Sequence, residues 1–169
     1  MRSNMKSRTV LFLTAVSGFG FFLLGCSSDP APTKACTTYQ VPAGTDLTKP
    51  AVAFRADVIP IFKQSCAFSS CHGGTAGGVT INVNDPAATR KAIVGVASGE
   101  LTSMQFVAAG DPGNSYLMRK MDGDSCTLKA SCSKSADDCA ASMPKDSDLL
   151  DVSQRDVVRR WIAQGAKDD

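Results

Sequence analysis

The chain has 169 residues, and its 18 lysines and arginines nearly balance 16 aspartates and glutamates, for a formal net charge of +2. This balance, with no clustered basic stripe, argues against a nucleic-acid-binding surface. Seven cysteines and a single histidine, His72, are the unusual features of the composition.

The start of the chain has the pattern of an export signal. Basic residues without an acid are followed by an apolar run from Val10 to Leu24, which is too short to be interpreted as a membrane-spanning helix. The sequence LLGC at the end of this run resembles the processing site of a bacterial lipoprotein signal. The resemblance implies a lipid on Cys26; the alternative is an ordinary signal peptide with a cysteine there by chance. We therefore expect the protein in the cell envelope, lipid-anchored to a bacterial membrane, periplasm-facing or in the outer membrane.

Composition divides the rest of the chain into two parts. Residues 26–50 are rich in serine, threonine, proline and alanine, with few large aliphatic side chains, so they are predicted to form a flexible tether. Residues 51–169 carry the hydrophobic patterns of one small folded domain. Without residues 1–25, which contain three basic groups and no acid, the charges of the chain nearly cancel.

The first expected helix covers residues 54–65, where Phe54 and Val58 begin a pattern of apolar residues at helical spacing. Pro60 lies inside this pattern and predicts either a kink or two short helices. The segment leads directly into Cys66.

Two shorter helices are expected further along the chain. Residues 86–97 begin with proline at a favourable first helical position and continue with aliphatic residues. Asn114 or Ser115 would cap a short helix that runs through Met121.

The final helix has the clearest pattern. Ser153 and Asp156 approximate a capping box, and Gly165 marks the end of the helix. Its apolar face is formed by Val157, Val158, Trp161 and Ile162. The chain is therefore predicted to be mostly α, a small helical domain with long irregular loops that are cross-linked by disulfides.

Six cysteines remain if Cys26 carries a lipid. Thiols outside the cytoplasm oxidise, so an even number should be paired or otherwise capped. Either all six form disulfides, or Cys66 and Cys71 serve another purpose and two disulfides join Cys36, Cys126, Cys132 and Cys139. The polar stretch 126–139 has no periodicity, so we expect an irregular loop with at least one disulfide inside it.

The segment SCAFSSCHGG places two cysteines five positions apart and the only histidine directly after the second. A haem attached through thioethers uses two cysteines followed by histidine, ordinarily spaced C-x-x-C-H, whereas here the spacing is C-x-x-x-x-C-H. A zinc site with a loop cysteine and a small disulfide with a chance histidine are the alternatives. Zinc is disfavoured because the adjacent side chains of Cys71 and His72 diverge.

Because His72 is the only histidine, a second iron ligand would have to be another residue type. Methionine is a common second ligand in c-type cytochromes. Met104, Met118 and Met121 lie in segments that predict ordinary core positions. Met143 instead stands in a polar loop before a proline, where packing does not explain it.

The motifs CHGG, GDPGNSYL and WIAQGA, in this order over residues 54–166, resemble those of small class I c-type cytochrome domains, in particular the planctomycete type. The resemblance implies a cytochrome c-like fold with haem c. It assigns Cys66 and Cys71 to the thioethers, His72 to the proximal iron position and Met143 to the distal one. Trp161 matches the aromatic residue of the family's terminal helix.

These expectations lead to a membrane-tethered monohaem electron carrier that exchanges electrons with redox partner proteins and is not an enzyme, because both axial positions of the iron are taken. The alternative is a haem-free lipoprotein cross-linked by disulfides, with Cys66 and Cys71 oxidised, that serves as a structural or binding module.

Overall fold

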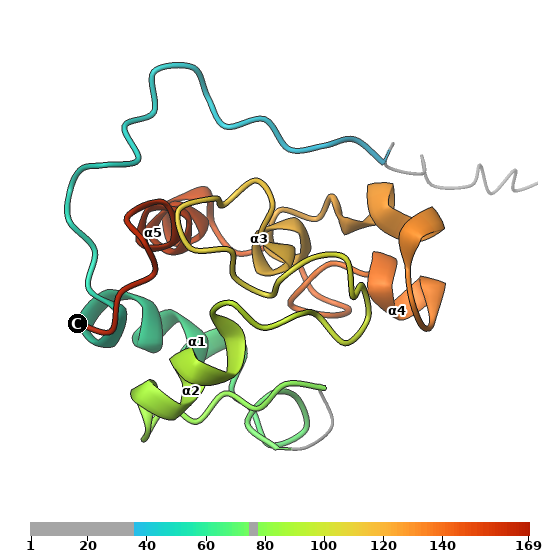
Figure 1. The fold of residues 1–169 in the computed structure, drawn as a ribbon, viewed down its shortest axis with the longest axis horizontal. Coiled ribbons are helices and arrows are strands. Elements are labelled where there is room, and N and C mark those ends of the chain that lie inside the picture. Colours follow the sequence, from blue (N-terminus) through green and yellow to red (C-terminus); the bar gives the residue numbers. More distant parts are fainter. Residues whose placement is uncertain (1–35, 75–77) are drawn as a thin grey trace, which may run out of the picture. The chain divides into compact units, whose positions relative to one another are not determined.

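The computed structural model describes residues 36–74 and 78–169. The expected signal, Cys26 and the first part of the expected tether lie outside these residues. Within them the fold consists of short helices joined by long connections, with isolated β-bridges and no named strand (Figure 1). The prediction of a mostly α fold with disulfide cross-links agrees with this architecture.

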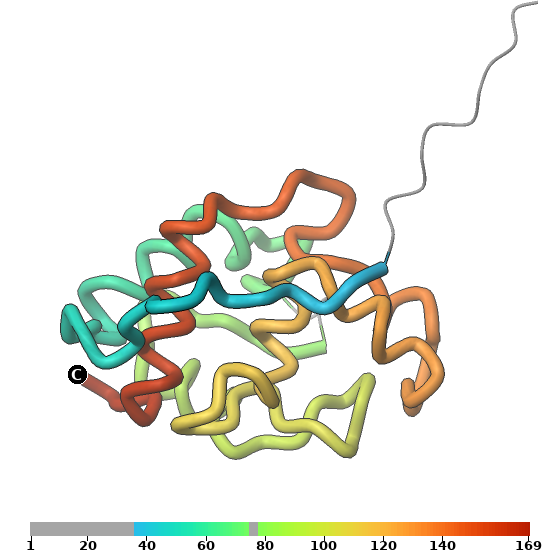
Figure 2. The backbone as a smooth tube through the Cα atoms, turned by 90° about the horizontal axis from the view of Figure 1, so that it is seen from above, coloured from blue at the N-terminus to red at the C-terminus, as the bar shows by residue number. Residues whose placement is uncertain are grey.

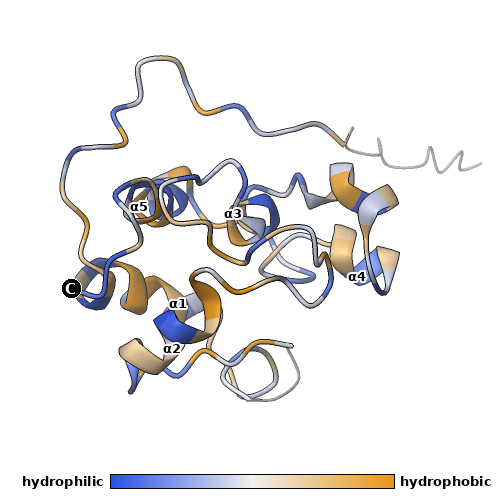
Figure 3. Cartoon of the chain, in the orientation of Figure 1, coloured by the Kyte–Doolittle hydropathy of each residue, from blue (hydrophilic) through white to orange (hydrophobic). Residues whose placement is uncertain are grey.

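The first helical segment is divided close to Pro60, as the sequence predicts. A π-helix, η1 (Phe54–Val58), continues directly into α1 (Ile59–Ser65). Pro60 lies in the first turn of α1, directly after η1, so the change of helix type falls where the proline has no N–H to donate. The hydrophobic part of α1 (Figure 3) includes the buried residues Ile59, Ile61 and Phe62, and the last residue of the helix precedes Cys66.

The next two helices begin where the sequence predicts. In α2 (Pro86–Ile93), the Asp85 side chain caps the helix by accepting from the Ala88 N–H at 3.0 Å. This helix ends four residues earlier than expected, because Val94 is extended and forms a bridge with Val107. Ser115 occupies the N-cap of α3 (Tyr116–Met121).

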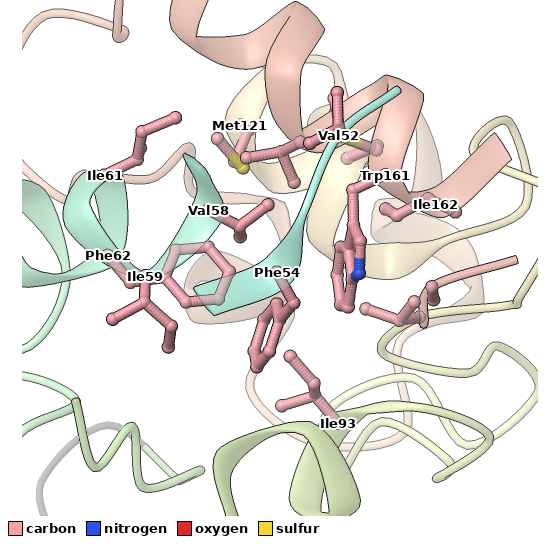
Figure 4. Packing of buried hydrophobic residues seen from close by; sticks show 14 of the residues in the cluster. Val52, Phe54, Val58, Ile59, Ile61, Phe62, Ile93, Met121, Trp161 and Ile162 are labelled. Atoms are coloured by element: carbon pink, nitrogen blue, oxygen red, sulfur yellow. The ribbon is translucent and has the colours of Figure 1, made fainter. Parts of the chain in front are cut away.

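The terminal helix α5 (Val152–Ala163) provides much of the core. The Trp161 ring stacks on Phe54 with centroids 4.6 Å apart, and its Nε1 donates to the Lys167 carbonyl at 2.9 Å. Figure 4 shows η1, α1 and α5 meeting around these rings. The helix begins after Asp151 instead of Ser153, and Gly165 has a φ of +99°, the left-handed conformation expected after a helix end.

The polar stretch 126–139 is more regular than predicted. It contains a 3₁₀ helix, η2 (Ser125–Ser131), and a short helix, α4 (Ala136–Ala140). A disulfide between Cys132 and Cys139 joins them, so the loop contains a cross-link as expected. Buried groups also fix α4: the Tyr116 hydroxyl donates to the Cys139 carbonyl, and Lys120 Nζ donates to the Asp138 carbonyl.

Residues 36–50, which we call the N-terminal strap, depart from the prediction of a flexible tether over 26–50. Cys36 forms a disulfide with Cys126, and Gln164 donates to the carbonyls of Leu47 and Pro50. Figures 1 and 2 show the strap running past α5. Composition predicted a free segment because the strap has few apolar residues; a cross-link and hydrogen bonds to its backbone fasten it instead.

A buried ionic cluster, absent from the predictions, lies under the strap. Arg155 and Arg159 of α5 both donate to Asp122, which follows α3, and the Tyr39 ring of the strap lies over both guanidinium groups, 4.9 and 4.8 Å from its centroid. The Tyr39 N–H donates to Asp124 at 2.7 Å. The cluster therefore joins α3, α5 and the strap.

In the part of the chain that the structure describes, each helix is too short or too polar to cross a membrane.

Candidate functional site

Cys66 and Cys71 are the two free cysteines among the described residues. The other four, Cys36, Cys126, Cys132 and Cys139, form the two disulfides. Cys66 follows α1 and packs partly against the hydrophobic core, whereas Cys71 is exposed. The structure thus separates the six cysteines that it describes into four that cross-link the fold and two that precede the histidine.

A tight turn takes up the chain between the two free thiols. The N–H groups of Cys71 and Gly73 both donate to the Phe68 carbonyl at 2.9 Å. The N–H of His72 donates to the carbonyl of Cys66 at 3.1 Å. Residues 68–71 are all exposed, so the additional length of the spacer projects into solvent while His72 returns to the backbone of Cys66.

The orientation of His72 is fixed by a hydrogen bond between its ring and the backbone. Its Nδ1 lies 3.1 Å from the Val79 carbonyl oxygen. Because a carbonyl oxygen only accepts, Nδ1 is the protonated nitrogen in this bond, and Nε2 of the neutral ring carries the free lone pair. This is the tautomer that a histidine needs to bind a metal through Nε2.

Burial makes the Cys66 thiol hard to ionise. Desolvation, and secondarily the neighbouring Cys71, raise the pKa of Cys66 from its ordinary value to about 11. The thiol is therefore protonated at neutral pH and reacts slowly unless something removes its proton.

Met143 lies at a different point in the fold. Its N–H donates to the Lys120 carbonyl at 2.9 Å, near the end of α3, and the side chain is only partly buried. The segment around it, including Ala141, Lys145 and Asp148, lines a polar hollow. Among residues 36–74 and 78–169 no hydrogen bond or core contact links Met143 to the Cys66–His72 segment.

The other methionines of the described residues have packing roles. Met118 and Met121 are each 2% exposed and belong to the main core, while the partly buried Met104 packs beside Leu101 and Tyr116. Within residues 36–74 and 78–169, Met143 is thus the one methionine outside the two clusters of core contacts, which agrees with its sequence context.

The zinc alternative finds no support in the described part of the chain. No group of three or more histidine, cysteine or acidic side chains suited to hold a metal ion is present there. Zinc would have required a thiolate from the 126–139 loop, and the three cysteines of that loop, Cys126, Cys132 and Cys139, are all in disulfides.

Two features of this site were missed from the sequence. The glycines of CHGG were considered only as part of a sequence motif, whereas Gly73 and Gly74 pack tightly against the spacer between the cysteines. The bond from His72 to Val79 was not expected at all. The repeated glycine directly after the histidine was the available signal for a close backbone approach.

Comparison with protein-family models, with curated proteins and with solved structures finds no match to this chain.

Proposed function

We propose that this chain is a membrane-tethered monohaem c-type cytochrome, an electron carrier. One observation carries the proposal: Nδ1 of the only histidine bonds to the Val79 carbonyl, which leaves Nε2 of the neutral ring as the ligating nitrogen, and this histidine directly follows the one cysteine pair that the described fold leaves free. Support also comes from the sequence resemblance to small c-type cytochrome domains. Two thiols and one oriented imidazole supply the groups that would attach haem and bind its iron from the histidine side.

The two thiols differ in a way that suits covalent attachment instead of free-thiol chemistry. In an exported protein two unpaired cysteines need a cap. Cys71 is accessible and Cys66 is protonated and partly buried, which makes this pair a poor redox-active dithiol, since the attacking species is the thiolate. Two thioether bonds to one cofactor would cap both.

Each residue then has a defined part. Cys66 and Cys71 would hold the cofactor covalently, and His72 Nε2 would be the proximal iron ligand, with Val79 fixing the ring. Met143 is proposed as the distal ligand from its sequence context and its position outside the core. Haem with two protein ligands supplies one-electron transfer and leaves no open iron position, so the protein is proposed to be no enzyme.

The proposed setting is the bacterial cell envelope, periplasm-facing or at the outer membrane. A lipid on Cys26 would hold the protein to the membrane, and redox partner proteins would exchange electrons with it. Cys26→Ala should then move the protein into the soluble fraction, because the lipid on Cys26 is the proposed attachment. A variant that stays in the membrane fraction contradicts lipid anchoring without touching the haem proposal.

The haem proposal is tested by expressing the protein in a host with cytochrome c maturation machinery. Denatured wild-type protein should retain one covalent haem by mass and by its reduced absorption band. Replacing Cys66 and Cys71 with alanine should abolish this, whereas the matched replacement of Cys132 and Cys139 should retain it. A colourless wild-type protein with a Cys66–Cys71 disulfide would instead support the haem-free structural or binding module.

The distal ligand is tested separately. Met143→Ala should keep the covalent haem, open the iron to added ligands and lower the reduction potential, because thioether ligation favours reduced iron. Met104→Ala is the matched control and should leave the ligand-field spectrum unchanged. If Met143→Ala has no effect on that spectrum, Met143 is not the ligand.

A further inference from the structure

We infer that Gly73 and Gly74 are positioning residues for His72, because only residues without a side chain allow the chain to fold back over the widened cysteine spacer. The role assigned to His72 rests on the proposed function, but the fold-back itself is independent of haem. The inference explains how a spacer of four residues between the cysteines can serve a site that ordinarily has two.

The contacts at the two glycines leave no room for a β-carbon. A Cβ at Gly73 would lie 2.2 Å from the Ala67 carbonyl oxygen and 2.7 Å from its carbon. At Gly74 it would lie 2.4 Å from the Ser69 carbonyl oxygen. These neighbours are backbone atoms of the spacer, so a change of side-chain rotamer cannot relieve the clash; the backbone of the turn would have to move.

The requirement is steric and not conformational. Six glycines of the described chain have positive φ, namely Gly44, Gly78, Gly95, Gly110, Gly123 and Gly165, and neither Gly73 nor Gly74 is among them. An alanine at either position could adopt the local backbone angles. What it could not do is approach the carbonyl groups of Ala67 and Ser69 so closely.

This close approach is what places the histidine. With the chain folded back, the His72 N–H reaches the Cys66 carbonyl at 3.1 Å and the His72 carbonyl accepts from the Ile81 N–H at 2.7 Å. These two bonds hold the backbone on both sides of the imidazole, and the ring then bonds to Val79. Moving residue 73 away from Ala67 would disrupt the turn that brings His72 back to the backbone of Cys66.

The single histidine makes this directly measurable in haem-free protein. The ring nitrogen NMR spectrum of reduced protein, made without a histidine tag, reports the tautomer of His72 alone. Wild type should show the Nδ1–H form. Gly73→Ala and Gly74→Ala should shift the population toward the Nε2–H form, and amide exchange at His72 and Ile81 should become about tenfold faster or more.

Gly99→Ala is the matched control, since its β-carbon would meet only the end of the Lys134 side chain at 4.0 Å and its φ is not positive. It should match wild type in both measurements. In the maturation host, Gly73→Ala and Gly74→Ala should attach markedly less haem than Gly99→Ala, or lose the low-spin spectrum, while the Trp161 fluorescence of the core stays native.

The outcomes separate the inference from the proposed function. If wild type attaches no haem but the glycine variants still change the His72 tautomer, the haem proposal fails and the positioning role stands. If Gly73→Ala and Gly74→Ala keep the wild-type tautomer, exchange and haem yield, the inference is overturned. If Gly73→Ala fails to fold, the same measurements on Gly74→Ala decide whether the inference holds.

Discussion

Arg159 on α5 places its Nη2 2.6 and 2.7 Å from the two carboxylate oxygens of Asp122, although both side chains are buried. Arg155 donates to the same carboxylate at 2.6 Å. One acid between α3 and α5 thus pairs with two buried guanidinium groups. Its loss would leave Arg155 without an acidic partner and Arg159 with Asp156 alone.

Asp122→Asn is expected to lower the free energy of unfolding by about 3–5 kcal/mol, because removing one partner of a buried ion pair leaves an uncompensated charge. Urea unfolding measures the change. Asp137→Asn is the control: its bond to Lys129 is exposed on both sides, so the expected change is below about 1 kcal/mol. Equal effects of the two substitutions would contradict the structural importance of the cluster.

The Tyr39 ring should contribute separately through its place over the two arginines. Tyr39→Ala is expected to cost about 1–2 kcal/mol, since cation–π contacts with partly desolvated arginines fall in this range. Tyr39→Phe keeps the ring and should retain nearly full stability. A loss as large in the phenylalanine variant would show that the hydroxyl group, not the ring, stabilises the strap.

The two disulfides are expected to differ in their effect on stability. Cys36 and Cys126 are 90 positions apart, and Cys132 and Cys139 are 7 apart. On the chain-entropy model the long bond contributes about 4–5 kcal/mol and the short one about 2 kcal/mol. Unfolding of the two paired alanine variants tests the order, and a larger loss from the short bond would contradict it.

The two free thiols should be distinguishable by alkylation of haem-free, reduced protein. Cys71 is exposed and should be labelled first. The pKa of Cys66 is raised to about 11, so at pH 8 only roughly one thiol in a thousand is ionised, and its labelling rate should keep rising until the pH approaches that pKa. Mass spectrometry at a series of pH values follows both sites.

The haem-loaded protein should show no labelling at either position after denaturation, because both sulfurs are then thioethers. The alkylation pattern is therefore also an independent check on the cofactor. Rapid labelling of Cys66 at pH 8 in folded haem-free protein would contradict its burial.

The sequence predicted those helices that apolar spacing and caps define. Pro60, Ser115 and Gly165 each have the local role expected of their residue type. The helices in the 126–139 stretch escaped prediction because they are too short to show a period and are held by a disulfide and by buried side chains from elsewhere. Such support comes from residues distant in sequence, which periodicity does not detect.

The burial of two charged side chains in α5 was also not predictable from the sequence. Arg155 and Arg159 have the polarity of solvent-facing helix positions, and only their long-range partners Asp122 and Tyr39 explain why they are buried. At the candidate site, the residue types of Cys66, Cys71 and His72 pointed to the chemistry, whereas the geometry that orients the ring depends on Val79 and could not be inferred from spacing.

The N-terminal strap limits how far the domain could travel from a lipid on Cys26. A free segment from Cys26 to Ala51 would span up to about 90 Å when fully extended, at about 3.6 Å per residue. With Cys36 bonded to Cys126, only the ten residue-to-residue steps from position 26 to position 36 would remain as spacer, a reach of about 36 Å. The Cys36–Cys126 bond would thereby restrict the proposed electron exchange to partners at or near the same membrane surface.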